Sequence, residues 1–187
     1  MKSDLELIND INDKNWDVRY QVARRINIEH LPKMMNDKYW EVRREVAERI
    51  DPKHLPKMMN DEDYSVRREV AARIGDEGGA FASEHLPKMM NDENYSVRLE
   101  VASRIGKEHL PKMMNDENFQ IRYEVASRIG KEHLPKMMND ENFQIRYEVA
   151  KRIDPKFLGE MFGFDFDPKY QMGLIKVLAE REDLRRV

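Results

Sequence analysis

The chain has 187 residues, of which 37% are charged and 40% are hydrophobic, and it contains no cysteine. At about 150 residues per domain, this length suggests one domain. The charged fraction exceeds the value of about 25% that is usual for globular proteins, which predicts many exposed helix faces around a thin core. The lack of cysteine excludes a disulfide framework, a cysteine nucleophile and a thiolate-bound metal in this chain.

The 33 basic and 36 acidic residues are interspersed along the chain and leave a formal net charge of −3. This balance argues against a polybasic arm for nucleic acid and against an acidic tail. The first residues, MKSDLE, contain no apolar run of the kind found in secretion signals. No stretch approaches the roughly 18 apolar residues of a membrane span. We therefore expect a cytoplasmic protein with no membrane partner.

Methionine pairs reveal an internal repeat. They are Met34-Met35, Met58-Met59, Met89-Met90, Met113-Met114 and Met137-Met138, so successive pairs begin 24, 31, 24 and 24 residues apart. One full unit reads NDENYSVRLEVASRIGKEHLPKMM. Repetition at this period indicates a solenoid. We predict one repeat domain over 1–187: a half-repeat cap in 1–11, six repeats in 12–162 with an insertion at 76–83, and a capping helix in 163–187.

Each unit predicts one α-helix and one shorter helix. In the unit quoted above, Val97, Val101 and Ile105 are four residues apart, as on one face of an α-helix. Gly106 follows directly, in the place of a C-terminal cap, as do Gly75 and Gly130 in their units. The second half, EHLPKMMND, contains a proline and is long enough only for a 3₁₀ turn. No segment alternates in polarity, so we expect an all-α fold.

The C-terminal segment departs from the repeat. Asp167 can cap, and Pro168 can begin, a helix with one apolar face formed by Tyr170, Leu174, Val177 and Leu178. A solenoid needs such a terminal element to cover its last core face. The nearby aromatics could also dock a partner or a second copy of the chain, so self-association through the cap is a further expectation. These aromatics are Phe162, Phe164 and Phe166.

The repeated pattern V-R-x-E-V-A-x-R-I, followed by L-P-x-M-M-N-D, resembles the leucine-rich repeat variant family over about residues 12–162. The resemblance implies a HEAT-like, right-handed superhelical solenoid in which α-helices alternate with short 3₁₀ helices. Some members of the family carry an N-terminal iron–sulfur domain held by cysteine. Because this chain has no cysteine, we expect neither that domain nor any other cofactor.

One arginine in each unit falls inside the apolar arc of its helix; Arg98, for example, lies ~100° from Val97 on the helical wheel. An unpaired buried charge costs several kcal/mol, so each arginine requires a partner. An aspartate precedes every helix, and we predict a structural Asp–Arg ladder between neighbouring helix starts. The alternative is an arginine stripe that binds anions or phosphate. The ladder comprises Arg19, Arg43, Arg67, Arg98, Arg122 and Arg146 with Asp13, Asp37, Asp61, Asp92, Asp116 and Asp140.

A glutamate precedes an arginine by four residues in five units. This spacing is typical of an exposed ion pair worth about 0.2–0.5 kcal/mol. We favour that interpretation over paired catalytic carboxylates, because no glutamate has a second acid beside it to raise its pKa. The pairs are Glu45–Arg49, Glu69–Arg73, Glu100–Arg104, Glu124–Arg128 and Glu148–Arg152.

Histidine occupies one column, at His30, His54, His85, His109 and His133. Stacked units lie about 8–10 Å apart, so this column cannot bring three or four ligands to within about 2 Å of one ion. We therefore expect no metal site, and we interpret the glutamate before most of these histidines as a hydrogen-bonding partner. The paired methionines are predicted to fill the core rather than to line a partner groove.

Two neighbouring columns are candidates for partner binding because aromatic and arginine side chains on a partly exposed face are typical of binding hot spots. Packing at the edge of the core is an equally weighted alternative. Phe81, in the glycine-rich insertion, is a further candidate, since long loops on rigid scaffolds often carry function. The candidates are Trp16, Tyr20, Trp40, Arg44, Arg68, Leu99, Tyr123, Tyr147 and Phe81, and the aromatic column continues through Tyr64, Tyr95, Phe119 and Phe143.

Three functions are compatible with these patterns. The favoured one is a non-enzymatic scaffold that binds a protein or peptide along one face of the solenoid. Nucleic-acid binding, as in HEAT-like DNA glycosylases, needs a one-sided basic surface, and here acidic columns accompany the basic ones. An enzyme is the third alternative, although the sequence contains no nucleophile–base set and no glycine-rich phosphate loop.

Overall fold

The computed structural model describes residues 3–164 and 168–181, and every regular element in these ranges is helical. α-Helices alternate with 3₁₀ helices (η), so the prediction of an all-α solenoid with this alternation is confirmed. The right-handed sense of the superhelix stays a prediction. The chain divides into two compact units, Met1–Ile105 and Gly106–Val187, and each is described by itself.

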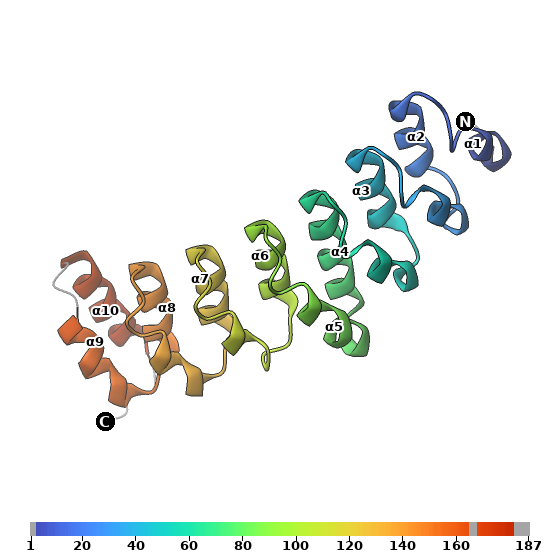
Figure 1. Cartoon of the computed structure of the whole chain (residues 1–187). Helices are drawn as coiled ribbons and strands as arrows, with labels where there is room; N and C mark the ends of the chain where they lie inside the picture. Colours follow the sequence, from blue (N-terminus) through green and yellow to red (C-terminus); the bar gives the residue numbers. More distant parts are fainter. Residues whose placement is uncertain (1–2, 165–167, 182–187) are drawn as a thin grey trace. The chain divides into compact units, whose positions relative to one another are not determined.

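The first unit contains six α-helices and three 3₁₀ helices among its described residues. They are α1 (Asp4–Asn9), α2 (Trp16–Ala23), η1 (Ile28–Met34), α3 (Trp40–Arg49), η2 (Pro52–Met58), α4 (Tyr64–Glu77), α5 (Gly79–His85), η3 (Leu86–Lys88) and α6 (Tyr95–Arg104). Helices α2, α3, α4 and α6 pack side by side in chain order (Figure 1). The 3₁₀ helices contact them: η1 packs on α3, η2 on α4, and η3 on both α4 and α6.

The second unit repeats this plan in its described residues. It contains η4 (Leu110–Lys112), α7 (Phe119–Arg128), η5 (Lys131–Lys136), α8 (Phe143–Arg152), η6 (Pro155–Phe157), α9 (Leu158–Phe164) and α10 (Pro168–Glu180). Helix α8 lies between α7 and α10, which both pack against it (Figure 1). Within the described residues of the chain, no helix combines the length and the apolar character that crossing a bilayer requires.

The core of each repeat lies between its α-helix and its 3₁₀ segment. In the second repeat, Val42, Val46, Ile50 and Leu55 are completely buried. The first methionine of each pair is also buried, with Met58 3% exposed. The second methionine is half-buried in four of the five pairs. One thioether per pair therefore fills the gap between successive helices, and the other lies nearer the surface except at Met59, which is also buried.

The expected glycine caps are wrong. Helices α3, α6, α7 and α8 end at isoleucines with extended backbone, such as Ile105 with ψ 150°. Gly75 lies inside α4, which continues to Glu77 because the insertion adds a helical turn. The insertion then reverses at Gly78 and Gly79, the residues with positive φ among those described, and forms α5.

Helix α10 takes the place of a further repeat helix. Arg181, directly after its end, donates hydrogen bonds to the carbonyls of Ala150 (3.1 Å) and Ile153 (2.7 Å) at the end of α8. Asp167 and Phe166 lie outside the described residues, and the side chains of Phe162, Phe164, Tyr170, Leu174 and Leu178 lie outside the described part. Self-association through this cap stays a prediction.

Candidate interaction surface

Buried arginine–aspartate pairs join successive α-helix starts. Arg43 donates from Nε and Nη2 to the two carboxylate oxygens of Asp61 at 2.7 and 2.8 Å, and from Nη1 to the backbone carbonyl of Asp37 at 2.7 Å. One guanidinium thus binds the loops of two consecutive repeats. Because all three of its nitrogens donate within the protein and its side chain is only 6% exposed, it is not open to a phosphate, which argues against the anion-binding alternative.

The same pairing recurs through both units. The side chains of each pair are between 6% and 9% exposed, and the pairs are Arg19–Asp37, Arg43–Asp61, Arg67–Asp92 and Arg122–Asp140. Arg98 and Arg146, at the same helix position, donate to the carbonyls of Asp92 (2.9 Å) and Asp140 (2.7 Å). Asp116 accepts the backbone N–H of Asn118 at 2.9 Å.

The Arg19–Asp37 pair predicts a loss of stability in acid. Burial alone would raise the pKa of Asp37, but hydrogen bonds from Arg19 and from the backbone N–H of Tyr39, with the charge of Arg43, lower it below its ordinary value. A carboxyl whose pKa is lowered by folding stabilises the fold above its unfolded pKa of about 3.9, and that contribution is lost as the pH falls through the folded pKa.

We therefore expect Asp37→Asn to reduce the free energy of unfolding at neutral pH and to flatten its decline in acid. Urea denaturation of both proteins between about pH 7 and about pH 3 measures this difference. Parallel curves for the two proteins across that range would show that Asp37 is not the titrating group.

The Glu–Arg columns are not the exposed ion-pair rows that we expected. The i, i+4 pair forms at Glu100–Arg104 (2.6 Å) and lies at 4.0 Å between Glu124 and Arg128. In three other repeats the arginine reaches the open carbonyls at the end of the preceding repeat's helix. The recipients are Ala23 and Ile26 for Arg49, Ala47, Glu48 and Ile50 for Arg73, and Ala126 and Ile129 for Arg152.

At the ends of α3 and α7, which Arg73 and Arg152 reach, the following isoleucine has an extended backbone, and the last carbonyls lack an intrahelical donor. A cation at a helix C-terminus also interacts favourably with the helix dipole. The associated glutamates lie deep between helices; Glu45 and Glu148 are each only 7% exposed. These glutamates and arginines therefore stabilise the contacts between adjacent repeats and do not form a solvent-exposed face.

Four of the five histidines lie near the preceding glutamate, but the expected hydrogen bond is not formed in most of them, because three of the four separations exceed 3.5 Å. The separations between Nε2 and Oε1 are 3.3 Å for His30–Glu29, 3.8 Å for His85–Glu84, 3.6 Å for His109–Glu108 and 3.6 Å for His133–Glu132. In the described part of the chain, no three acidic or histidine side chains are grouped so that they could hold a metal ion.

The aromatic column is exposed, and each of its residues is the first of a repeat's α-helix, four in the first unit and two in the second. The exposed fractions are 36% for Trp16, 37% for Trp40, 47% for Tyr64, 47% for Tyr95, 44% for Phe119 and 56% for Phe143. The residue before five of the six rings caps the helix with its side chain; Asp63 and Asn94, for example, accept the backbone N–H groups of Ser65 and Ser96. Tyr39, before Trp40, makes no such bond. We call these six residues the aromatic row.

The second candidate column, four residues after the aromatic row in each helix, takes part in contacts between repeats. Its members are Tyr20, Arg44, Arg68, Leu99, Tyr123 and Tyr147. Arg68 lies 3.4 Å from Glu100, and the hydroxyl of Tyr123 donates to Glu148 at 3.4 Å. The ring of Tyr147 packs so closely on Gly173 that a Cβ there would come within 3.2 Å of it. These contacts favour packing between repeats for this column.

Some members of that column are still accessible. Arg44 is exposed, and so is Tyr123 despite its contact with Glu148, whereas Tyr20 and Leu99 are half-buried. Phe81 does not extend from the insertion as a free aromatic: it is half-buried and packs edge-on against His85, with ring centroids 4.6 Å apart. The contact between Phe81 and His85 indicates that the insertion packs within α5, the helix that it forms.

A set of loop residues beside the aromatic row was missed at the sequence level. Glu62 and Glu93 precede Tyr64 and Tyr95 by two residues, and their side chains are 81% and 85% exposed. Glu141, before Phe143, is 84% exposed. One feature of the sequence could have identified these residues: this loop position is lysine in the first two repeats and glutamate in the other four.

No family model matches the sequence, and a search of curated proteins finds no match. Among solved structures, the chain is similar to a leucine-rich repeat variant, with 30% sequence identity and a TM-score of 0.85, over 95% of this chain and 72% of the other. It is also similar in fold to the YibA protein of E. coli, with 20% identity and a TM-score of 0.57, over 95% and 81% of the two chains. The repeat pattern, the alternation of helices and this similarity agree: the chain belongs to the leucine-rich repeat variant family.

Proposed function

We propose that this helical repeat protein is a non-enzymatic scaffold that binds a protein or peptide partner along its aromatic row. The observation that carries the proposal is the exposure of one aromatic ring per repeat, at the same helix position in all six repeats. Scattered exposed apolar residues are normal in proteins, but exposed rings on neighbouring helices of one unit are typical of interaction sites. Aromatic residues also supply much of the binding energy at protein interfaces.

The ladder supports this proposal because it holds the helix starts in fixed positions. Arg67 joins the loop before Tyr64 to the loop before Tyr95, through the Asp61 carbonyl (2.8 Å) and the carboxylate of Asp92 (2.7 Å). A binding surface that is rigid before association loses less conformational entropy when the partner binds. No observation favours nucleic acid at this surface, since Glu62 and Glu93 would repel phosphates.

Affinity capture from cell extract tests the proposal when the wild-type protein is compared with a Tyr64→Ala/Tyr95→Ala variant. Both rings are nearly half exposed, so we expect the melting temperature to change little. We expect a partner held by the wild type to be lost from this variant, because the anchoring rings are gone. The matched control is Ile28→Ala, which removes a 49%-exposed apolar side chain from η1.

The control should retain the partner as the wild type does. Equal capture by the wild type and the double variant would place the interaction elsewhere on the molecule and overturn the proposal.

A further inference from the structure

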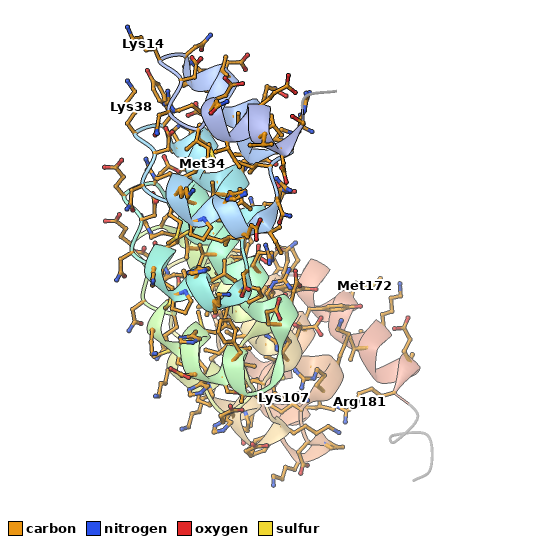
Figure 2. All side chains as sticks on the ribbon, turned by 90° about the vertical axis from the view of Figure 1, so that its right-hand side faces the viewer. Lys14, Met34, Lys38, Lys107, Met172 and Arg181 are labelled. Atoms are coloured by element: carbon orange, nitrogen blue, oxygen red, sulfur yellow. The ribbon has the colours of Figure 1, made fainter. Side chains whose placement is uncertain are left out.

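The charge beside the aromatic row changes along the chain. The loop residue two positions before the first helix residue is Lys14 and Lys38 in the first two repeats, and both side chains extend from the same edge of the first unit (Figure 2). In the third and fourth repeats the same position is Glu62 and Glu93. It is Glu117 and Glu141 in the second unit. The aromatic row therefore has a basic border at its beginning and an acidic border over the remaining four repeats.

A pocket recurs in the acidic part, once within each unit. The first has a volume of about 360 Å³ and is lined by Glu62, Asp63, Tyr64, Arg67, Glu93 and Asn94. The second has a volume of about 480 Å³ and is lined by Glu117, Asn118, Phe119, Arg122, Glu141 and Asn142. The six lining positions are the same in the repeat, so both pockets have an aromatic wall and two glutamates.

The arginine at the floor of the first pocket does not make it basic. Arg67 is only 8% exposed in its side chain and is bound by both carboxylate oxygens of Asp92, at 2.7 and 2.9 Å. Arg43 is paired with Asp61 in the same way, and each arginine also contacts one rim glutamate: Arg43 contacts Glu62 at 3.0 Å and Arg67 contacts Glu93 at 3.2 Å. Each buried arginine is thus already neutralised by an aspartate, and the exposed glutamates add negative charge at the rim.

The helix start behind the pocket is also shielded. Its free N–H groups would favour an anion, but Asp63 accepts the N–H of Ser65 at 2.8 Å and Asn94 accepts that of Ser96 at 2.9 Å. Neither the buried arginine nor the helix start therefore makes the first pocket attractive to an anion.

We propose that the partner is a basic, extended segment whose lysine or arginine side chains enter these pockets, between the aromatic wall and the two glutamates. The inference rests on the proposed function and specifies its partner. An aromatic face attracts a cation within about 6 Å of its centre, and the flanking carboxylates complement its charge. Glu62, Tyr64 and Glu93 bind in the first unit, and Glu117, Phe119 and Glu141 in the second.

The test measures fluorescence anisotropy with a labelled lysine–glycine–serine repeat peptide and the full chain. We expect Glu62→Lys/Glu93→Lys to weaken binding about tenfold or more, because two attractive charges become repulsive. The variant should fold, since Lys14 and Lys38 occupy the same loop position in the first two repeats. Circular dichroism melting checks that it does.

The matched control is Glu29→Lys/Glu84→Lys, which makes the same change in net charge on the 3₁₀ side of the same unit, where both glutamates are exposed. It should bind within about twofold of the wild type, because neither glutamate lines the pocket and exposed charges are screened over about 8–10 Å at moderate salt. An equal loss in the control and the pocket variant would show that only net charge matters, and would overturn the inference.

Acetylation of the lysines in the peptide removes their charge and keeps their length, so the acetylated peptide should not bind. Binding that survives acetylation would exclude recognition of the cation. If the wild type fails to bind the basic peptide but still captures a partner through Tyr64 and Tyr95, the basic partner is wrong and the proposed function stands. If instead the Tyr64→Ala/Tyr95→Ala variant captures the partner as well as the wild type does, the proposed function is overturned, even where the wild type binds the peptide.

Discussion

Replacing Arg43 with alanine is expected to lower the free energy of unfolding by about 3–5 kcal/mol, the usual cost of removing one partner from a buried ion pair. The change removes the two bonds to Asp61 and the bond to the Asp37 carbonyl, and it leaves the Asp61 carboxylate, 8% exposed, without its counter-ion. Urea denaturation followed by circular dichroism measures the loss.

Arg44 provides the control, since it is the next residue on the same helix and is exposed. Arg44→Ala removes the same charge and should change the free energy of unfolding by no more than about 0.5 kcal/mol. Similar effects of the two substitutions would mean that the buried pair contributes nothing beyond ordinary helix packing.

The second large effect is expected at Arg73, whose guanidinium caps the preceding helix. Arg73→Ala leaves the carbonyls of Ala47 and Ile50, at 3.0 and 3.1 Å from its nitrogens, without this donor. Hydrogen bonds from charged groups contribute about 1.5–3 kcal/mol, so we expect a destabilisation of about 2–3 kcal/mol. Thermal and urea unfolding both report it.

Arg104 is the natural comparison, because the preceding helix α4 continues past Gly75 and has no open end at this level. Arg104 instead pairs with Glu100 and Asp76, and its side chain is 32% exposed. Arg104→Ala should therefore cost less than about 1 kcal/mol, as for other partly exposed ion pairs. A cost at Arg104 as large as that at Arg73 would contradict the capping role.

Much of the fold could be predicted from the sequence because the repeat multiplies each local signal. The spacing of Val97, Val101 and Ile105 predicts the buried helix face, and the proline of the second half predicts the 3₁₀ turn. The position of Arg98 inside the apolar arc required a carboxylate nearby, and the aspartate before each helix was the available group. The structure places such pairs at Arg43–Asp61 and Arg67–Asp92.

The contacts between repeats could not be predicted in the same way. A glutamate four residues before Arg73 has the spacing of an exposed ion pair. A helical wheel describes one helix alone, so it does not show that the end of the neighbouring helix lies within reach of Arg73. Gly75 has the sequence position of a cap, but the insertion that follows keeps the chain helical. The packing of Phe81 on His85 depends on the turn at Gly78 and Gly79, whose direction the composition does not specify.

The large charged fraction of the chain has two structural origins. Buried Asp–Arg pairs and capping arginines such as Arg73 hold the repeats together, and their charges are satisfied within the protein. Exposed charges border the aromatic row and change from lysine to glutamate along it, as from Lys38 to Glu62. Only the second group is exposed to a partner, so an almost neutral chain can still present separate basic and acidic borders beside the aromatic row.

Carboxyl footprinting of the protein in complex with its captured partner tests the binding surface most directly. Exposed glutamates on both sides of the repeats react in the free protein, so mass spectrometry compares the two sides in one sample. We predict that Glu62, Glu93 and Glu141, beside the aromatic row, become protected. The 3₁₀-side residues Glu29, Glu84, Glu108 and Glu132 should react as before. Protection of the 3₁₀ side with no change beside the aromatic row would contradict the proposed binding surface.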